Sequence, residues 1–541
     1  MNFNKNFNAT TYKYNSNRNV VFSNRGMVAT GNPMAAQAGI DILKKGGNAI
    51  DAAIATAVVL SVVEPTCNGV GGDAFALVWD GKKLHGMNAS GKSPELITLE
   101  EIKSMGYKKI PTEGVIPITV PGQVGGWIEL SKKFGKLEFK ELFTSAIDYA
   151  RNGYIVQPLV SKLWGREYDR FKNSIDDNTF LDEWFKVFAP NDMPLKAGEL
   201  FKNPELAKSL EDIALTKGES FYNGVIAEKI DIFMKENKGY LRKKDLEKYK
   251  VQWVEPITTD FNNYTVAEIP PNGHGITVLM ALNIFKNLSL DEDINSEESI
   301  HKQIESLKLA FSDVKEFIAD KDHMRTDVLS LLSDDYSKTR ASLINENALD
   351  PIYGDPEKGG TVYLATADKF GNMVSYIQSN YTQFGSGVVI PGTGITMHNR
   401  GANFSLDSES DNSLAPNKKP YHTIIPGFLL KDKKAIGPFG VMGAFMQPQG
   451  HFQVLLGTLV EGLNPQDALN KPRWQWVGDK NIEVENSFDK EVVKALIKRG
   501  HHVTIKEDNT SFGRGEIIWR NKDDVFCGGC EPRTDASIAI W

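Results

Sequence analysis

The sequence predicts a large mixed α/β protein. From about residue 114 to 340 the apolar side chains recur at helical spacing, whereas short strand-like runs dominate from residue 361 onward. Apolar residues make up 41% and charged residues 24% of the 541, a composition typical of a globular protein with a substantial core. A chain of this length could form about two to four average domains or one α/β unit whose halves interleave. Length alone does not decide between these two organisations.

The charge balance argues against a nucleic-acid partner. The 62 basic and 69 acidic residues give a net charge of −7, without the excess of basic residues that is typical of nucleic-acid-binding proteins. The first twenty residues are polar and rich in asparagine, unlike an export signal, and no later run is apolar enough to span a membrane. We therefore expect a cytoplasmic protein that binds neither nucleic acid nor membrane.

The cysteines and histidines give no metal or redox motif. Three cysteines are too few for a disulfide framework, and Cys527 and Cys530 form a single CxxC without a second metal-ligand pair. We interpret Cys-Gly-Gly-Cys as a glycine-rich turn, with a zinc half-site or redox pair as the weaker alternative. His501 and His502 lack metal-ligand spacing to other candidates, so we expect them at the edge of a strand and predict no metal and no cofactor.

The N-terminal part of the chain alternates strands and helices. A strand is predicted over 27–30, followed by a helix that Pro33 opens and a second, alanine-rich helix over 49–62. A glycine-rich turn and a hairpin come next, with one strand over 74–79, a turn at 80–81 and then a second strand. The turn, at 69–72, precedes its strand, whereas a dinucleotide-binding turn would follow one, so nucleotide binding is a weak alternative.

The middle of the chain is predicted to be mostly helical. Trp127, His301 and Phe311 fall on the apolar faces of such helices, and we interpret them as core residues. The acidic stretch 290–299 is predicted to be a solvated connection without a partner.

The C-terminal part begins with two strands joined by a turn near residue 370. Helices are predicted over 449–462 and 465–470, and the chain closes with a βαβ-like unit over 481–507. We find no internal repeat.

The stretch with the clearest chemistry is Lys-Gly-Gly-Thr at 358–361, where a glycine loop meets a strand. A threonine hydroxyl needs a base, and the sequence offers neither a GxSxG elbow nor a histidine that can be paired with a serine. Cleavage of the Gly360–Thr361 bond would supply one, because a free α-amino group has a pKa of about 7.7–8.0. Glycines at 359 and 360 allow a strained, exposed carbonyl. We predict self-cleavage in front of Thr361.

Several blocks of the sequence resemble the γ-glutamyltranspeptidase family of N-terminal-nucleophile hydrolases. They are GNPMAAQAGIDILKKGGNAIDAAIATAVV, VPGQVGGW, GGT at 359–361, FGSGVVIPGTGITMHNRGANFSL and APNKKPYHTIIPGFLL, and the similarity covers the chain from about residue 20. The resemblance implies a four-layer αββα sandwich cut into a large subunit (21–360, after a polar tail, 1–20) and a small subunit (361–541). The two subunits would form one domain, and a homodimer of such heterodimers is left open.

The resemblance also assigns catalytic roles. Thr361 matches the nucleophile, and Ser379 matches a second hydroxyl that orients it. Gly443 and Ala444 match the paired small residues whose N–H groups stabilise the tetrahedral oxyanion. Alanine in place of the second glycine still supplies its N–H group.

The substrate pocket departs from the transpeptidases. Their arginine for the glutamyl carboxylate is replaced by Ser90, and their acidic residue for the ammonium by Asn403, while an uncharged neighbour becomes Arg400. The positions expected to bind substrate are Ser90, Tyr381, Arg400, Asn403, His422 and Thr423. A site that gains an arginine and loses an acid should prefer an anionic acyl group without an ammonium, although a scaffold ion pair would explain Arg400 equally well and His422 fits an orienting role.

We therefore expect a self-processing threonine amidohydrolase of the acylase-like branch, which acts on a small-molecule amide such as an oxamate or glutaryl compound. A true γ-glutamyl hydrolase or transpeptidase is the alternative within enzymes. An uncleaved pseudoenzyme with a binding or structural role is the alternative from another class.

Overall fold

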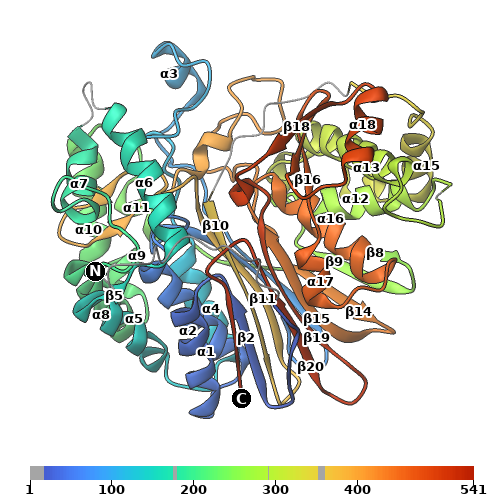
Figure 1. Ribbon diagram of the computed structural model, residues 1–541. Helices are drawn as coiled ribbons and strands as arrows, with labels where there is room; N and C mark the ends of the chain where they lie inside the picture. The colour runs from blue at the N-terminus through green and yellow to red at the C-terminus, as the bar shows by residue number, and fades with distance from the viewer. Residues whose placement is uncertain (1–17, 175–178, 290, 351–359) are drawn as a thin grey trace, which may run out of the picture.

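The computed structural model describes residues 18–174, 179–289, 291–350 and 360–541. Most of the predicted polar tail and Gly359 lie outside these residues. Two seven-stranded sheets form the centre of the molecule, with helices on both outer sides (Figure 1). This is the predicted four-layer αββα arrangement.

The first sheet has its strands in the order β1 (Val21–Ser23), β20 (Phe526–Cys530), β19 (Arg514–Arg520), β15 (Lys434–Met442), β14 (Gly427–Lys431), β9 (Tyr264–Glu268) and β8 (Ile257–Phe261). The second has the order β21 (Ser537–Ile540), β2 (Gly26–Thr30), β10 (Gly360–Asp368), β11 (Met373–Tyr381), β3 (Asp73–Trp79), β4 (Leu84–Ala89) and β7 (Gln252–Val254). Each sheet therefore mixes strands from before and after residue 360.

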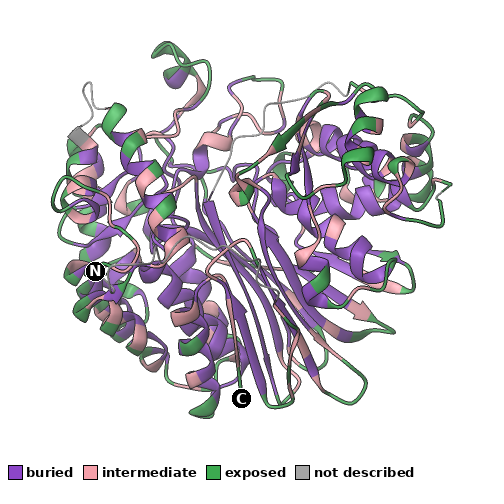
Figure 2. Cartoon of the chain, in the orientation of Figure 1, coloured by how far each residue is buried: buried purple, intermediate pink, exposed green. Residues whose placement is uncertain are grey.

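The sheets face each other through β10, β11, β15 and β19, and these four strands are buried over most of their length (Figure 2). All nine residues of β10 and all nine of β11 are buried. Both faces of these two strands are covered, so their polar side chains, such as Thr366, Ser375 and Gln378, are buried as well as their apolar ones.

Helices α1 (Pro33–Lys44), α2 (Ala49–Val63) and α4 (Gln123–Phe134) cover the second sheet. Every residue of α2 is buried. A Cβ on Gly39 of α1 would lie only 2.3 Å from the Thr56 hydroxyl of α2, so the small residues predicted here do permit close packing. On the other side, α12 (Ile276–Phe285), α16 (Met446–Leu459) and α17 (Pro465–Asn470) cover the first sheet, and α13 (Glu297–Phe317) packs outside α12.

The remaining helices of the described chain surround these layers. They are α3 (Leu99–Ser104), α5 (Thr144–Asn152), α6 (Pro158–Asn173), α7 (Asp182–Phe188), α8 (Pro204–Thr216), α9 (Glu219–Tyr222), α10 (Val225–Glu236), α11 (Lys243–Glu247), α14 (Val328–Leu331), α15 (Asp334–Ala341) and α18 (Lys490–Lys498). Short strands complete the fold: β5 (Tyr154–Ile155), β6 (Leu200–Phe201), β12 (Val389–Ile390), β13 (Ile395–Thr396), β16 (Trp474–Gly478), β17 (Asn481–Glu485) and β18 (His502–Lys506).

Most predicted elements are confirmed, including both N-terminal helices, the hairpin of β3 and β4 and the β17–α18–β18 unit, whose strands are parallel. Trp127, His301 and Phe311 are buried, as predicted. His502 begins the edge strand β18, also as predicted.

The helical prediction for 114–340 missed strands β7, β8 and β9. The hairpin β8–β9 turns at Asn262 and Asn263, which have φ angles of 48° and 65°. Asparagine tolerates this left-handed region better than most residues, so a two-residue Asn-Asn turn between short β-rich runs was the overlooked signal.

The Cys-Gly-Gly-Cys prediction was wrong: Cys527 to Cys530 form a strand, not a turn. A Cβ on Gly528 would lie 2.5 Å from the Met27 sulfur, and one on Gly529 2.7 Å from Pro465. The absence of side chains at Gly528 and Gly529 therefore allows Met27 and Pro465 to pack closely against this strand. Helix α16 begins at Met446, before the predicted start, because Pro448 is tolerated in a first helical turn.

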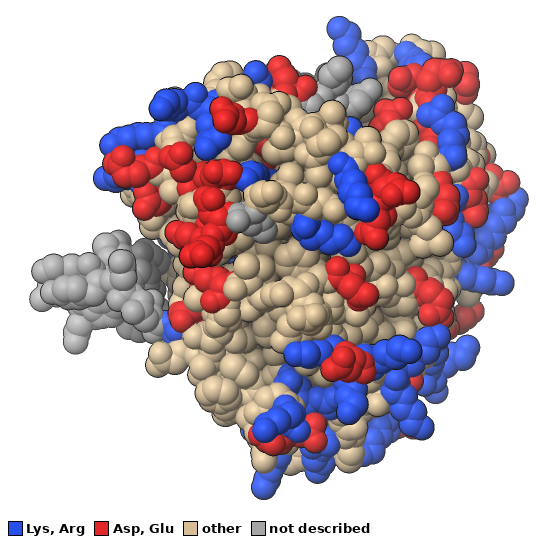
Figure 3. Space-filling model, turned by 90° about the vertical axis from the view of Figure 1, so that its right-hand side faces the viewer, with Lys and Arg blue, Asp and Glu red and all other residues tan. Residues whose placement is uncertain are grey.

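The described surface carries basic and acidic groups side by side (Figure 3). Among the described residues, each helix is too short or too polar to cross a lipid bilayer.

Candidate active site

Thr361 and Ser379 lie opposite one another on the central strands β10 and β11. The Thr361 hydroxyl donates to Ser379 Oγ at 3.1 Å, and the Ser379 hydroxyl donates to the carbonyl oxygen of Gly360 at 2.7 Å. The backbone N–H of Tyr381 also donates to Ser379 Oγ, at 2.8 Å. Ser379 thus connects the threonine hydroxyl to the carbonyl of the peptide bond in front of it.

This arrangement follows from an irregularity in the strand pairing. The register shifts between Gly360 and Val362, and Tyr381 has a φ of 76° at the end of β11. A bulge re-aims side chains locally, and here the hydroxyls of both strands meet beside one carbonyl. All three polar groups are buried, so they are shielded from competing water.

Gly443 and Ala444 form the corner between β15 and α16. Their φ angles are 136° and 51°, so both adopt the left-handed backbone that favours glycine. Successive residues in such turns can direct neighbouring N–H groups toward an anion. Alanine at 444 is strained there, which indicates a corner that its surroundings hold in place.

A buried charged cluster lies next to these strands. Asp73, at the start of β3, is the strand partner of Ser379. Its Oδ2 lies 3.1 Å from His422 Nε2, 3.3 Å from His398 Nδ1 and 3.8 Å from Arg400 Nε. All four side chains are buried. The cluster joins strand β3 to two later loops.

The cluster contains an ionised carboxylate and a neutral imidazole. Burial alone would raise the pKa of Asp73, but its contacts with His398 and His422 hold that pKa well below its usual range. Burial, with the nearby Arg400 charge, lowers the pKa of His422 to about 3. The neutral His422 ring therefore donates an N–H to the Asp73 anion.

Arg400 is oriented by three contacts. Its Nη1 donates to the Thr423 hydroxyl at 2.8 Å, its Nε faces Asp73, and its guanidinium lies over the Tyr381 ring at 4.6 Å. Burial lowers the pKa of Arg400 to about 10, which still leaves it charged at neutral pH. Within the described chain, Nη2 is buried without a hydrogen-bond partner, and so is Asp73 Oδ1. A buried guanidinium with an unused N–H group is suited to bind an anion.

The structure connects most of the predicted site residues. Contacts run from Thr361 through Ser379 and Tyr381 to Arg400 and Thr423, and His422 joins through Asp73.

Ser90 and Asn403 are placed differently. The Ser90 hydroxyl donates to Asn88 Oδ1 at 2.6 Å, and the buried Lys419 ammonium donates to the same Asn88 oxygen at 3.1 Å. This network meets His422 at the backbone, where the carbonyl oxygen of Asn272 accepts from the His422 N–H. Asn403 Nδ2 has no hydrogen-bond partner among the described residues.

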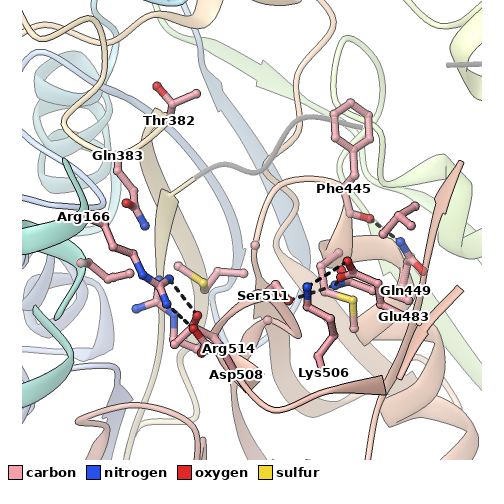
Figure 4. Close-up of a pocket in the computed structure, with 18 of the residues that line it drawn as sticks. Arg166, Thr382, Gln383, Phe445, Gln449, Glu483, Lys506, Asp508, Ser511 and Arg514 are labelled. Carbon is pink, nitrogen blue, oxygen red and sulfur yellow. Dashed lines mark hydrogen bonds and ion pairs between the residues drawn. The ribbon is translucent and has the colours of Figure 1, made fainter. Parts of the chain in front are cut away.

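A cavity of about 840 Å³ is lined by residues that follow β11 and by the corner before α16 (Figure 4). Gly443, Thr382 and Gln383 line it, and a Cβ on Gly360 would lie 3.3 Å from Gln383 Cγ. Its walls carry paired charges, among them Arg166 with Asp508, Lys506 with Glu483 and Arg514 with Glu64. This volume lies within the usual range for small-molecule sites.

Sequence reasoning missed Asp73 and His398. Asp73 was hidden because the hairpin prediction began at residue 74. An acidic residue at the head of a strand that is otherwise wholly apolar was the available signal. His398 gave no comparable signal, because its role depends on a loop that returns to β3.

Comparison with known proteins identifies the family. The family described as Gamma-glutamyltranspeptidase matches residues 35–541. The chain is 34% identical to the glutathione hydrolase-like YwrD proenzyme of Bacillus subtilis (strain 168), over 96% of this chain and 99% of that protein. It is 30% identical to the oxamate amidohydrolase proenzyme of Klebsiella pneumoniae, over 96% and 98% of the two chains.

A solved structure, the cephalosporin acylase from Bacillus halodurans, superposes with a TM-score of 0.96 at 52% identity and covers 99% of both chains. The chain described here therefore belongs to the γ-glutamyltranspeptidase family, and it is an enzyme of the N-terminal threonine hydrolase and acyltransferase class.

Proposed function

We propose that the chain cuts itself between Gly360 and Thr361 and then hydrolyses the amide of a small anionic acyl group through an acyl-enzyme on Thr361. The observation that carries the proposal is the continuous contact path from the Thr361 hydroxyl through Ser379 and Tyr381 to the buried Arg400.

The hydrogen bonds suggest how self-cleavage begins. The Thr361 hydroxyl passes its proton to Ser379 Oγ while Ser379 passes its own proton to the Gly360 carbonyl oxygen. Thr361 Oγ1 then bonds to the Gly360 carbon without a net charge developing in the buried site. Collapse of this intermediate moves its hydroxyl proton to the nitrogen, breaks the Gly360–Thr361 C–N bond and leaves an ester with a free α-amino group. Water then hydrolyses the ester to a Gly360 carboxylate and restores the Thr361 hydroxyl.

The new α-amino group of Thr361 then serves as the base for its own hydroxyl. Its pKa of about 7.7–8.0 leaves a useful neutral fraction at pH 7. Attack on a substrate amide would form an oxyanion that the N–H groups of Gly443 and Ala444 stabilise. The amine leaves with a proton, and water releases the acyl group as a carboxylate.

Arg400 favours an anionic acyl group. Its charge is only partly compensated, because the nearest Asp73 oxygen is 3.8 Å away and Nη2 has no hydrogen-bond partner in the described structure. A carboxylate would complete a charge-assisted pair there. Among the relatives, the names of the oxamate amidohydrolase and the cephalosporin acylase are consistent with this preference. The relative described as glutathione hydrolase-like supports the alternative, a γ-glutamyl substrate, which the experiment below therefore includes.

The two products of cleavage should stay associated. Residues 21–360 and 361–541 contribute neighbouring strands to both sheets, as in the pairing of β2 with β10 and of β3 with β11. Separation would expose the buried strands of the core.

The test combines a denaturing gel with a small substrate panel. We expect two bands of roughly two-thirds and one-third of the mass, because residues 361–541 number 541 − 360 = 181, and Thr361 at the second amino terminus. We also expect faster hydrolysis of glutaryl-anilide or oxamate than of γ-glutamyl-anilide.

Two results would overturn parts of the proposal. A single stable band after long incubation, without activity, would support a pseudoenzyme. Efficient release of glutamate from γ-glutamyl-anilide would favour the transpeptidase reading and remove the argument from Arg400.

A further inference from the structure

Two histidines and a glutamate lie close together beside α13, and one of the histidines is far from the other two residues in the sequence. His301 and Glu305 lie one turn apart on α13, and His501 lies in the turn between α18 and β18. All three are buried, and one ligand atom from each lies within 4.8 Å of the others. We propose that these three residues form a binding site for Zn²⁺ or a chemically similar transition-metal ion.

The spacing of the three atoms suits such an ion. His301 Nδ1 lies 2.9 Å from His501 Nε2, which lies 3.6 Å from Glu305 Oε1. With zinc–ligand bonds of about 2.0–2.1 Å, the ligand atoms of a tetrahedral site lie about 3.3 Å apart. The two distances lie on either side of that value, so small side-chain rotations would complete the three contacts.

The hydrogen bonds around His301 leave the correct nitrogen available. Its Nε2 lies 2.8 Å from the carbonyl oxygen of Asn345, which can only accept, so Nε2 carries the proton. Nδ1 therefore directs a lone pair at His501. Metal-binding histidines are usually oriented by a bond of this kind from the other ring nitrogen.

The second histidine is also available as a neutral ligand. His501 is buried, its Nε2 donates to the lone pair of His301 Nδ1, and its own Nδ1 has no hydrogen-bond partner within the described residues. A metal ion would replace the proton now shared between the two rings, and that proton would move to the unused Nδ1. Imidazole ligands favour Zn²⁺ or Co²⁺ over Mg²⁺ or Ca²⁺.

Lys308 sets a limit on the affinity. Its ammonium lies 2.8 Å from Glu305 Oε1 and donates to the carbonyl oxygen of Leu349 at 2.6 Å. Part of the Glu305 charge is already used, and we expect binding weaker than at a site with a free carboxylate.

The site would stabilise the end of the large subunit. Asn345 is bound by His301, and the backbone of Leu349 by Glu305 and Lys308. These backbone groups lie shortly before the proposed cleavage point at residue 360. A bound metal would therefore hold α13, the His501 turn and this segment together, without touching Thr361.

The test uses the full-length protein, treated with a chelator and then titrated with Zn²⁺ or Co²⁺. We expect one ion per chain, a rise in Tm with added metal and, for Co²⁺, the visible absorption typical of nitrogen- and oxygen-ligated tetrahedral cobalt. His301→Ala and His501→Ala should each weaken binding by at least about 100-fold.

His502→Ala is the matched control, because His502 is the exposed neighbour of His501 and should bind metal normally. Near-ultraviolet circular dichroism checks the folding of each variant, and Co²⁺ absorption of the unmodified protein tests the site if a variant fails to fold. The proposal is overturned if the unmodified protein binds no ion, or if binding survives in both folded variants. Neither result bears on self-cleavage at Thr361.

Discussion

The proposed nucleophile region, around Thr361, and the proposed acyl-binding region, around Arg400, are built in different ways. Thr361 and Ser379 face each other across one pair of adjacent strands, and each hydroxyl is satisfied by the other or by Gly360. Around Arg400, by contrast, strand β3 and two loops contribute to one buried cluster, and polar atoms of both Arg400 and Asp73 remain unpaired in the described structure. The first region is a completed hydrogen-bond network, whereas the second is suited to be completed by a ligand.

The difference suggests that chemistry and substrate choice can be changed separately. Substitutions in the first region should affect every substrate alike, since they alter the reacting groups. Substitutions in the second should affect substrates according to their charge.

Thr361→Ala should have the largest effect. It removes the proposed nucleophile, so we expect no self-cleavage and less than about a thousandth of the activity toward any amide. A denaturing gel and an anilide assay measure both. Cleavage at residue 360 in this variant would show that another group attacks the bond.

Ser379→Ala should slow both reactions by about 10²–10³, because the proton path from Thr361 to the Gly360 carbonyl is lost. The rate of conversion of one band into two, followed over hours, gives the effect on processing. Equal loss for anionic and neutral substrates would sharpen the contrast with the Arg400 region. An unchanged processing rate would exclude the proposed path.

Arg400→Ala should cost about 2 kcal/mol in kcat/KM for glutaryl-anilide, because a buried carboxylate would lose its partner. Pentanoyl-anilide, which lacks the carboxylate, is the matched substrate and should be affected much less. Arg400→Lys keeps a charge beside Asp73 and should recover part of the loss. Equal losses on both substrates would assign Arg400 to the scaffold.

Acidification should weaken the acyl-binding region through His422. Its folded pKa is about 3 and its unfolded value about 6.5, so the unfolded chain binds a proton first as the pH falls. Stability is therefore present above about pH 6.5 and is lost toward pH 3, by up to about 1.4 kcal/mol per pH unit.

Denaturant unfolding of the native protein and of His422→Gln, compared between pH 6 and 4, measures the contribution of His422 together with its effect on the pKa of Asp73, which depends on the same contact. The variant should show the shallower decline. Equal slopes would mean that His422 is protonated in the folded protein.

The part of the site that could be predicted was the part encoded by residues next to one another in the sequence or by the family resemblance. The glycine loop before Thr361 and the strand after it could be recognised from neighbouring residues, and the resemblance supplied Ser379, Gly443 and Ala444. Their chemical type is fixed by what an acyl transfer needs. The alternating helices and strands could be recognised for the same reason, except where the Asn262–Asn263 turn was overlooked.

Asp73 and His398 were not recognisable in this way, and neither was the meeting of His301 with His501. A single polar residue in a strand or loop has no characteristic spacing, and its meaning depends on which side chains face it after folding.

The sequence by itself predicted the order of helices and strands, the proposed processing point and the strand that begins at Thr361, because these depend on periodicity and on residues adjacent along the chain. The αββα layering was implied by the resemblance to a known family. Only the tertiary structure decided which charges share a buried space. It brought Arg400 to Asp73 and left one side of its guanidinium open, and it separated Ser90 into another network. The physical reason is that burial strengthens electrostatic interactions between groups whose distance along the sequence says nothing about their distance in space.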